Sequence, residues 1–327
     1  MAIRMDTHVI AAVGPPGWPR ALWLVGTILL VAMLAHIAAL AITGGPVTGP
    51  VSLRKPITFA ETGWLTAWSV ALIQPTLRMR AWQRHVVGAS VLLFVIGETA
   101  IIGFQAWRGV PSHYNFSTPL DVALMRGGAA GTAAIFLIGI IILLGAALRS
   151  GDRPASQRLG VCAGIIVLLV GCAVGFVMIS NNSGVYQGSV GSGFANRAST
   201  YMGPSPMTIG PEYLLLRPST DGGDLVLLHA IGVHGLVLLA VPAVLLARSA
   251  MTPIRQLHVI GVAVVGVAVA MAILLVQAFR QLPLDRLHPL ALAALAVCTV
   301  ALLAADASVV AAVLRRRQAP NEPHERR

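Results

Sequence analysis

The sequence predicts an all-α membrane protein, a polytopic bundle of about eight transmembrane helices with both termini in the cytoplasm. Three observations predict this class. The 327-residue chain is 56% hydrophobic and only 11% charged, with a mean hydropathy of +0.80, whereas soluble domains are about 25% charged. Apolar runs of membrane-spanning length recur along the chain, and arginines concentrate in alternate connections. These features exclude a soluble enzyme and a disordered chain.

The apolar runs define the elements in order. A helix crosses a hydrocarbon core of about 30 Å with roughly 20 residues. The first run is too long for the core of a signal peptide and follows Arg4 and Arg20, so we interpret it as a retained span. The second run is the least apolar, because it contains Glu61, Thr62 and Gln74. The predicted spans are residues 21–42, 57–77, 86–108, 120–148, 159–180, 225–247, 257–279 and 289–314.

The orientation follows from the basic residues outside the spans. Fifteen arginines fall on the side of the two termini and seven basic residues, Lys55 among them, on the other side. Cytoplasmic connections carry the excess of Lys and Arg. We therefore expect a bacterial-type cell (inner) membrane protein with a cytoplasmic segment 1–20, a single transmembrane domain 21–314 and a basic cytoplasmic tail 315–327. The connection 181–224 is then extracytoplasmic, and its Gly, Ser, Asn and Pro content favours disorder over an ordered lid.

The charge pattern and the missing motifs limit the partners. The arginines are spread over short connections and form no basic groove, so the lipid bilayer is the expected partner and nucleic acid is not. Protein partners are not predicted. Cys162, Cys172 and Cys298 lie inside apolar runs and are expected to be small packing residues. No phosphate-binding loop, dinucleotide fingerprint or nucleophile elbow is present in the sequence.

Polar side chains gather in the outer halves of the predicted spans. Ionisable residues inside a membrane cost about 2.5–3.5 kcal/mol on insertion scales, so each is a candidate for function. The inner halves are almost entirely apolar, with Gln74 and Asp306 as the main exceptions. This distribution predicts a one-sided site. The outer-half residues are His36, Thr58, Glu61, Thr62, Glu98, Gln105, Arg108, Asp121, Arg126, His229, His234, Gln277, Arg280 and Gln281.

The third span carries the clearest polar stripe. At about 100° per residue, Glu98, Gln105 and Arg108 share an arc of roughly 80° and extend over about 15 Å. Gly109 and Pro111 are expected to end this helix, and Thr118 to cap the next, which holds His113 and Asn115 above the stripe. The alternative is structural: Arg108 reaches the head groups, Asp121 complements a helix N-terminus and Glu98 is a hydrogen-bonded packing residue.

The histidines of the sixth span diverge. His229 and His234 are five residues apart and point about 140° away from each other, so they cannot share one metal as an i, i+4 pair does. Each could instead meet a partner such as His36 or His113, or serve as an interhelical hydrogen-bonding residue. We expect only one of the two to face the site directly. The Gly127-x-x-x-Gly131 pair of the fourth span is predicted to be a close-packing face.

These arguments yield a defined set of candidate site residues. We predict one cluster beneath the outer surface formed by Glu98, Arg108, His113, His229 and His234, with the third and sixth spans as neighbours. Whether the protein is an enzyme stays open, and so does the cofactor, for which haem and a transition metal are both candidates. The candidate catalytic residues are Glu98, Arg108 and His113, the cofactor-binding ones His36, His229 and His234, and the substrate-binding ones Lys55, Gln105, Asn115 and Asp121.

Two blocks of sequence are similar to a family of multi-pass membrane proteins. The first runs from Glu98 through Gln105-Ala106-Trp107-Arg108-Gly109 and Ser112-His113-Tyr114-Asn115 to Thr118-Pro119 and Asp121. The second is Gly223-Asp224-Leu225 with His229, Gly232 and His234, and Lys55-Pro56-Ile57-Thr58-Phe59 is a shorter match. In these blocks the chain resembles an uncharacterised bacterial family, and it has Val226 and Val237 where the family has Arg and Gln. The resemblance covers about forty residues and implies the membrane fold but no activity.

Three functions are compatible with the sequence. A one-sided site of histidines, Glu98 and Arg108 would bind haem, a metal ion or a lipid head group, and a bound metal could activate water for hydrolysis of a lipid-borne bond with Glu98 as general base. A transporter or channel needs polar lining on both sides of the midplane, which the apolar inner halves disfavour. In a scaffold or assembly factor, the polar layer would only hold helices together.

Overall fold

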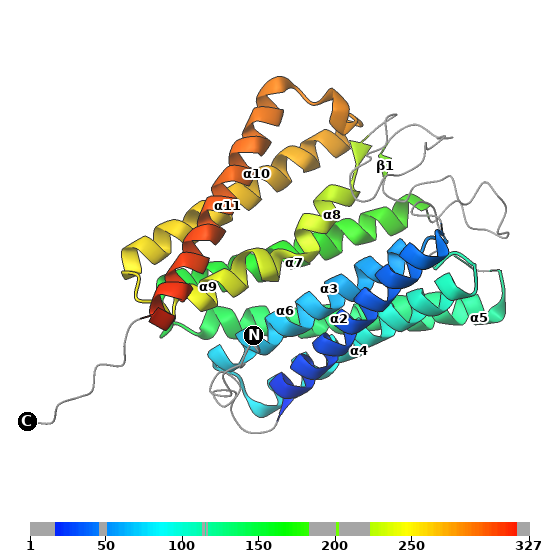
Figure 1. Ribbon diagram of the computed structural model, residues 1–327, viewed down its shortest axis with the longest axis horizontal. Coiled ribbons are helices and arrows are strands. Elements are labelled where there is room, and N and C mark those ends of the chain that lie inside the picture. The colour runs from blue at the N-terminus through cyan, green and yellow to red at the C-terminus, as the bar shows by residue number, and fades with distance from the viewer. Residues whose placement is uncertain are drawn as a thin grey trace, which may run out of the picture.

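The protein is a bundle of long helices that run back and forth between two ends (Figure 1). The computed structural model describes residues 17–45, 51–112, 115, 117–182, 201–202 and 223–318. The segment 1–16, most of the connection 181–224 and the tail 319–327 lie outside the described residues, so the predictions made for them are not tested. The helices are α2 (Trp18–Thr43), α3 (Arg54–Ile73), α4 (Ala81–Trp107), α5 (Pro119–Val122), α6 (Ala130–Arg149), α7 (Ala155–Asn182), α8 (Val226–Val233), α9 (Val241–Leu246), α10 (Pro253–Phe279) and α11 (Pro289–Gln318).

Shorter elements interrupt or connect these helices. Two π-helical segments, η2 (Ala123–Ala129) and η3 (Leu236–Ala240), join α5 to α6 and α8 to α9. Two 3₁₀ turns, η1 (Gln74–Thr76) and η4 (Leu284–Arg286), follow α3 and precede α11. In the described part of the chain, the only strands are β1 (Tyr201–Met202) and β2 (Gly223–Asp224), which form an antiparallel pair. The all-α prediction is therefore confirmed there, apart from this pair of two-residue strands.

The helices long and apolar enough to cross a membrane match most of the predicted spans. Six helices of the described chain meet that condition alone, and the bent pair of α8 and η3–α9 makes a seventh. The predicted number of about eight includes α3, which does not meet the condition because polar residues interrupt it. Yet α3 has 20 residues, which corresponds to about 30 Å of helix, and nearly half of its side chains are buried against neighbours. Its polar residues therefore need not face lipid.

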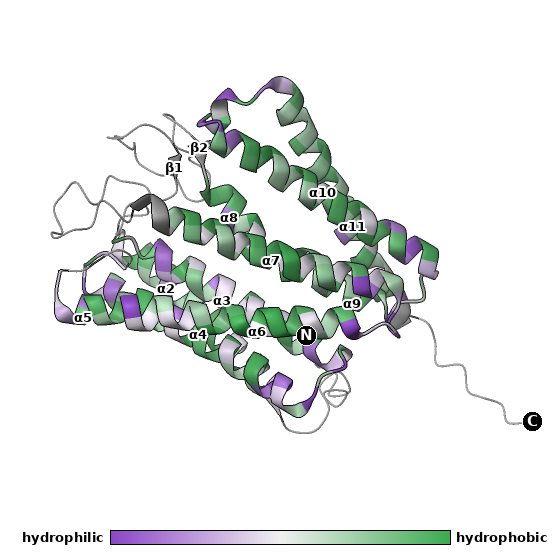
Figure 2. Ribbon diagram, turned by 180° about the vertical axis from the view of Figure 1, so that it is seen from behind, coloured by the Kyte–Doolittle hydropathy of each residue, from purple (hydrophilic) through white to green (hydrophobic). Residues whose placement is uncertain are grey.

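The two ends of the bundle differ in charge. We call one the polar end: there α2, α4, α7 and α10 finish and α3, α5, α8 and α11 begin. The arginine-rich end holds the starts of α2, α4, α7 and α10 and the finish of α11 (Figure 1). Figure 2 shows hydrophobic residues along most of each helix and hydrophilic ones mainly near the two ends. The arginines of the arginine-rich end include Arg78, Arg80, Arg84, Arg149, Arg153, Arg158, Arg248 and Arg255.

The arrangement of helices positions α3 at the centre. It packs against α2 and α4 on one side and against η3 and α9 on the other. The largest apolar core joins these helices to α6 and α7 through residues such as Ile73, Val91, Leu143, Ile165 and Val244. These residues come from the segments nearest the arginine-rich end, so that half of the bundle is closed by apolar packing.

A seam of glycines brings the backbones of α7 and the bent helix into close contact. A Cβ on Gly171 would lie 2.5 Å from the carbonyl carbon of Gly232, and one on Gly164 would lie 2.7 Å from the oxygen of Gly235. Such distances leave no room for a side chain. The predicted close-packing pair is wrong, because Cβ atoms on Gly127 and Gly131 would meet nothing within 4 Å.

Candidate functional site

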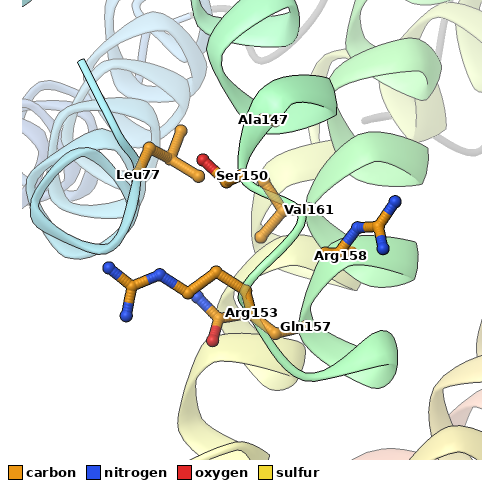
Figure 3. A pocket seen from close by; sticks show the side chains of 7 residues that line it. All are labelled: Leu77, Ala147, Ser150, Arg153, Gln157, Arg158 and Val161. Carbon is orange, nitrogen blue, oxygen red and sulfur yellow. The ribbon is translucent and has the colours of Figure 1, made fainter.

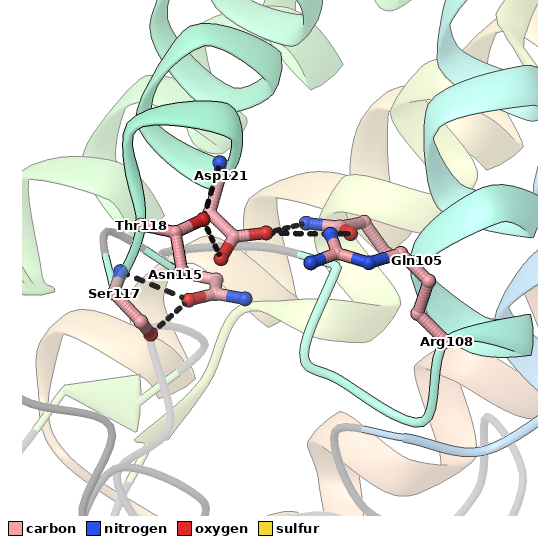
Figure 4. A network of polar contacts seen from close by, with 6 residues as sticks. All are labelled: Gln105, Arg108, Asn115, Ser117, Thr118 and Asp121. Carbon is pink, nitrogen blue, oxygen red and sulfur yellow. Dashed lines mark hydrogen bonds and ion pairs between the residues drawn. The ribbon is translucent and has the colours of Figure 1, made fainter.

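The most extensive polar network of the polar end joins the last turn of α4 to the start of α5 (Figure 4). Asp121 is 2% exposed, and its Oδ1 accepts hydrogen bonds from Gln105 Nε2 at 2.9 Å and from Arg108 Nη1 at 2.8 Å. Arg108 also donates to Gln105 Oε1, and the Thr118 hydroxyl donates to Asp121 Oδ2 at 2.7 Å. The carboxylate therefore has partners on both oxygens within the protein.

The loop between α4 and α5 begins and ends at the residues that the sequence predicts. Gly109 adopts φ +69°, and its N–H donates to the carbonyl of Ala106 at 3.1 Å, which ends α4. Thr118 caps the next helix, since its side-chain oxygen accepts from the backbone N–H of Asp121. Both predictions are confirmed. The buried Asn115 accepts from the backbone and hydroxyl of Ser117 (Figure 4). His113 lies outside the described residues.

Glu98 lies deeper on α4, on the side that faces α6. It is 6% exposed, and its Oε1 lies 3.3 Å from the hydroxyl of Thr132. The same hydroxyl lies 3.1 Å from the carbonyl of Ala129, so its single proton is shared between two acceptors. Glu98 is thus a buried, hydrogen-bonded residue that contacts another helix and does not face lipid.

His36 of α2 has both ring nitrogens engaged. Trp107 Nε1 donates to His36 Nε2 at 3.1 Å, and His36 Nδ1 lies 2.8 Å from the carbonyl of Ala32. Because Nε2 accepts, the proton of the neutral ring belongs on Nδ1. A metal or haem iron would have to displace one of these bonds.

The helix that carries the remaining histidines is broken between them and η3. Its two parts, Val226–Val233 and Leu236–Leu246, are bent by 48°. His229 Nδ1 lies 2.9 Å from the carbonyl of Gly171 on α7. His234 is the residue at the break, and no hydrogen bond to its side chain is found in the described chain.

Glu61 of α3 is the charged partner of His234. The carboxylate acts electrostatically on the His234 ring, and His234 in turn acts on His229. The Glu61–His234 separation exceeds the 4.0 Å of an ion pair. At 1.5 Å per residue, Glu61 lies about 10 Å and His234 about 12 Å from the helix starts at the polar end. The two groups therefore lie at a similar depth.

The predicted site residues fall into separate groups. The third predicted span is α4, which packs against α2, α3 and α6. The sixth is α8, η3 and α9, which pack against α7, α3 and α10. Helix α3 therefore lies between the third and sixth predicted spans. No hydrogen bond or ion pair within the described residues joins Glu98 or Arg108 to His229 or His234. Lys55 lies half-buried in the first turn of α3. Within the described ranges, no three His, Cys, Asp or Glu side chains gather as metal ligands would.

Several partners were not predictable as such from the sequence. Thr132 and Trp107 each hydrogen-bond to a candidate site residue on a different helix, and Glu61 acts electrostatically on His234. The sequence identifies Glu61 as a polar residue in a span, but helical spacing relates only residues of one helix. Which helices become neighbours depends on the glycine seam and on the position of α3, and neither has a local signature.

The fold and the site define a class, a multi-helix bundle with membrane-spanning helices and a buried polar layer towards one end. Comparisons with protein-family models, with curated proteins and with solved structures find no match.

Proposed function

We propose that the protein is an integral membrane protein with a one-sided acid–base site in its polar-end half, formed by Glu61, His234 and His229. The observation that carries the proposal is the 48° break at His234, whose ring lies within electrostatic reach of the half-buried Glu61 of α3. Broken helices and π-helical segments inside membranes are concentrated at functional positions. Here a π-helical segment, η3, follows the break directly.

The chemistry of the three groups suits proton exchange. Imidazole is the side chain that changes charge most readily near neutral pH, and intramembrane chains of Glu and His are typical of proton relays. His229 keeps its Nε2 open while Nδ1 is held at Gly171.

Apolar packing on the other half supports access from one side. The core that contains Ile73, Val91, Leu143 and Val244 occupies the segments near the arginine-rich end. A transporter would need a polar route through that core. We therefore favour a site that exchanges protons or ligand with one compartment over a transmembrane path.

The topology completes the proposal. We propose that α3 is an eighth crossing, because it is long enough and its polar residues are covered by α2, α4 and the bent helix. Fifteen arginines against seven basic residues then place both termini in the cytoplasm and the acid–base site towards the outside of a bacterial-type cell membrane. Membership of the family that the two sequence blocks resemble is part of the same proposal.

Haem or a transition metal at the same site is a variant of this proposal. His36 is the least suited ligand because both of its ring nitrogens are engaged. An absorption spectrum and metal analysis of the purified protein test this variant. A haem band or stoichiometric metal that His229→Ala and His234→Ala both abolish would replace proton exchange by cofactor binding.

Histidine titration tests the acid–base site itself. In ¹⁵N-histidine NMR spectra of the protein in nanodiscs, Glu61→Gln removes the charge that acts on the His234 ring, so the pH range over which His234 titrates should change. Glu98→Gln is the matched control, because the buried Glu98 carboxylate is bonded to Thr132 and to no histidine. If His234 titrates identically in wild type and Glu61→Gln, the proposed site does not exist.

A second candidate function is a membrane scaffold. One observation favours it: the Gln105, Arg108 and Asp121 network is satisfied by partners within the chain. Such a network holds helix ends together without a ligand. In that case His229 and His234 would stay in one protonation state throughout the titration. A partner protein would also co-purify in stoichiometric amount.

A further inference from the structure

A small pocket lies at the arginine-rich end, far along α7 from the acid–base site (Figure 3). It is partly open to solvent and encloses about 10 Å³, so a ligand larger than a water molecule would lie at its mouth. The connection between α6 and α7 and the first two turns of α7 form most of its wall. The lining residues are Leu77, Ala147, Ser150, Arg153, Gln157, Arg158 and Val161.

The pocket contains hydrogen-bond donors without acceptors. Gln157 is 6% exposed, and its Nε2 has no hydrogen-bond partner in the described chain. Arg153 Nε is also buried without a hydrogen bond; it lies 3.8 Å from Asp152 Oδ2, which is too long for one. Figure 3 shows the Arg153 and Gln157 side chains next to each other at the pocket. A buried donor left unpaired costs about 1–3 kcal/mol, so both donors point to a missing acceptor.

The charges around the pocket are those of an anion site. Asp152 is paired with Arg78 at 3.2 Å and lies 3.8 Å from Arg153 Nε, so two arginines face one carboxylate, and Arg158 also lines the pocket. The pocket also lies at the N-terminus of α7, whose first backbone N–H groups have no acceptor within the helix. That end of a 28-residue helix carries partial positive charge. The apolar Leu77 and Val161, which also line the pocket, would contact the uncharged part of a ligand.

We propose that a phosphate-type anion binds at the mouth of this pocket, with Gln157 Nε2 and the Arg153 guanidinium as the donors. Phosphate oxygens are acceptors only, and arginine is the residue best matched to them. The anion would be either the phosphodiester of an anionic lipid in the leaflet at the arginine-rich end or free phosphate, which share this chemistry. The site is independent of the Glu61–His234 pair, and its failure would leave that proposal unchanged.

Two arms of one experiment distinguish the sources. In the first, inorganic phosphate is titrated against the full chain in a neutral detergent at constant ionic strength, and the thermal unfolding midpoint is followed. In the second, the protein is extracted from nanodiscs of phosphatidylglycerol and phosphatidylcholine in equal parts, and native mass spectrometry counts the anionic lipid it retains. Binding in the first arm identifies free phosphate, and binding in the second arm alone identifies the lipid.

Variants decide whether the pocket is responsible. The double variant Arg153→Gln/Gln157→Leu removes the guanidinium charge and the Gln157 amide donor, and we expect at least about a tenfold loss of affinity in the arm that shows binding. Gln157→Glu, nearly the same size, should abolish binding by repulsion. Arg255→Gln is the matched control, an exposed arginine in the first turn of α10 at the same end. Folding is verified by circular dichroism and gel filtration.

The proposal is overturned by either of two results. One is that wild type binds neither phosphate nor phosphatidylglycerol. The other is that the double variant and Gln157→Glu, both folded, bind as tightly as wild type and Arg255→Gln.

Discussion

The Arg108 guanidinium and the Asp121 carboxylate, thirteen residues apart in the chain, meet at 2.8 Å and hold the end of α4 against the start of α5. The arginine is 29% exposed and the aspartate 2%. Gln105 bonds to both of them. This relationship joins the last turn of α4 to the first turn of α5 at the polar end.

Removing one member of that pair should destabilise the protein. Arg108→Gln leaves the buried Asp121 carboxylate without its cation, at a cost of about 1–3 kcal/mol. In the double variant Arg108→Gln/Asp121→Asn no charge is left unpaired, so the loss should be smaller than the sum of the single variants. Unfolding by dodecyl sulfate in mixed micelles measures both. Arg280→Gln is the control, because Arg280 is an exposed arginine at the same end. Equal losses of stability in Arg108→Gln and Arg280→Gln would contradict a stabilising role of the Arg108–Asp121 pair.

Alanine substitutions at a glycine inside the seam and at one outside it should change the stability in opposite directions. Gly171→Ala would force α7 and α8 apart, since its Cβ would lie 2.5 Å from Gly232, and should cost about 1–3 kcal/mol. Gly131→Ala has open space within 4 Å and should stabilise α6 by up to about 1 kcal/mol, because alanine favours the helix. The same unfolding assay ranks the two variants. A neutral Gly171→Ala would mean that the seam is not closely packed.

The Trp107–His36 hydrogen bond is accepted by the unprotonated nitrogen of the His36 ring. Trp107→Phe removes the N–H that donates to His36 Nε2, whereas the Ala32 carbonyl still holds the proton on Nδ1, so the tautomer should persist while the ¹⁵N signal of Nε2 moves to that of an unbonded nitrogen. The ¹⁵N shifts of His36 report the tautomer directly, and the loss in stability should be about 0.5–1.5 kcal/mol. Unchanged His36 shifts in Trp107→Phe would show that the bond does not form in the membrane.

The topology predicts the result of reporter fusions. Fusions at residue 82 and after residue 317 should report the cytoplasm, and fusions at residues 48 and 190–210 the outside. Opposite locations for residues 48 and 82 require that α3 crosses the membrane. The same location for both would remove the eighth span, and an outside signal at 82 with an inside signal at 200 would invert the orientation.

The sequence predicts the helices well because the bilayer thickness sets their length. The predicted span 120–148 corresponds to α5, η2 and α6, and 257–279 to α10, with boundaries that differ by a few residues. The caps at Gly109 and Thr118 are local in sequence, and both form as predicted. Local rules of this kind need no knowledge of neighbouring helices.

The arrangement of helices and the break at His234 could not be predicted. The break lies between Gly232 and Gly235, which approach Gly171 and Gly164 of α7. That approach is a tertiary contact and leaves no local signature. For the same reason the predicted cluster of Glu98, Arg108 and the histidines is divided by α3, and Glu61 becomes the partner of His234.

Access to His234 from one side tests the central claim most directly. The protein is reconstituted in one orientation into proteoliposomes whose inner and outer pH are set separately, and the ¹⁵N signal of His234 is followed by solid-state NMR. We predict that protonation of His234 follows the pH of the compartment facing the polar end and is insensitive to the compartment facing the arginine-rich end. A response to the arginine-rich side, or an equal response to both sides, would contradict a one-sided site.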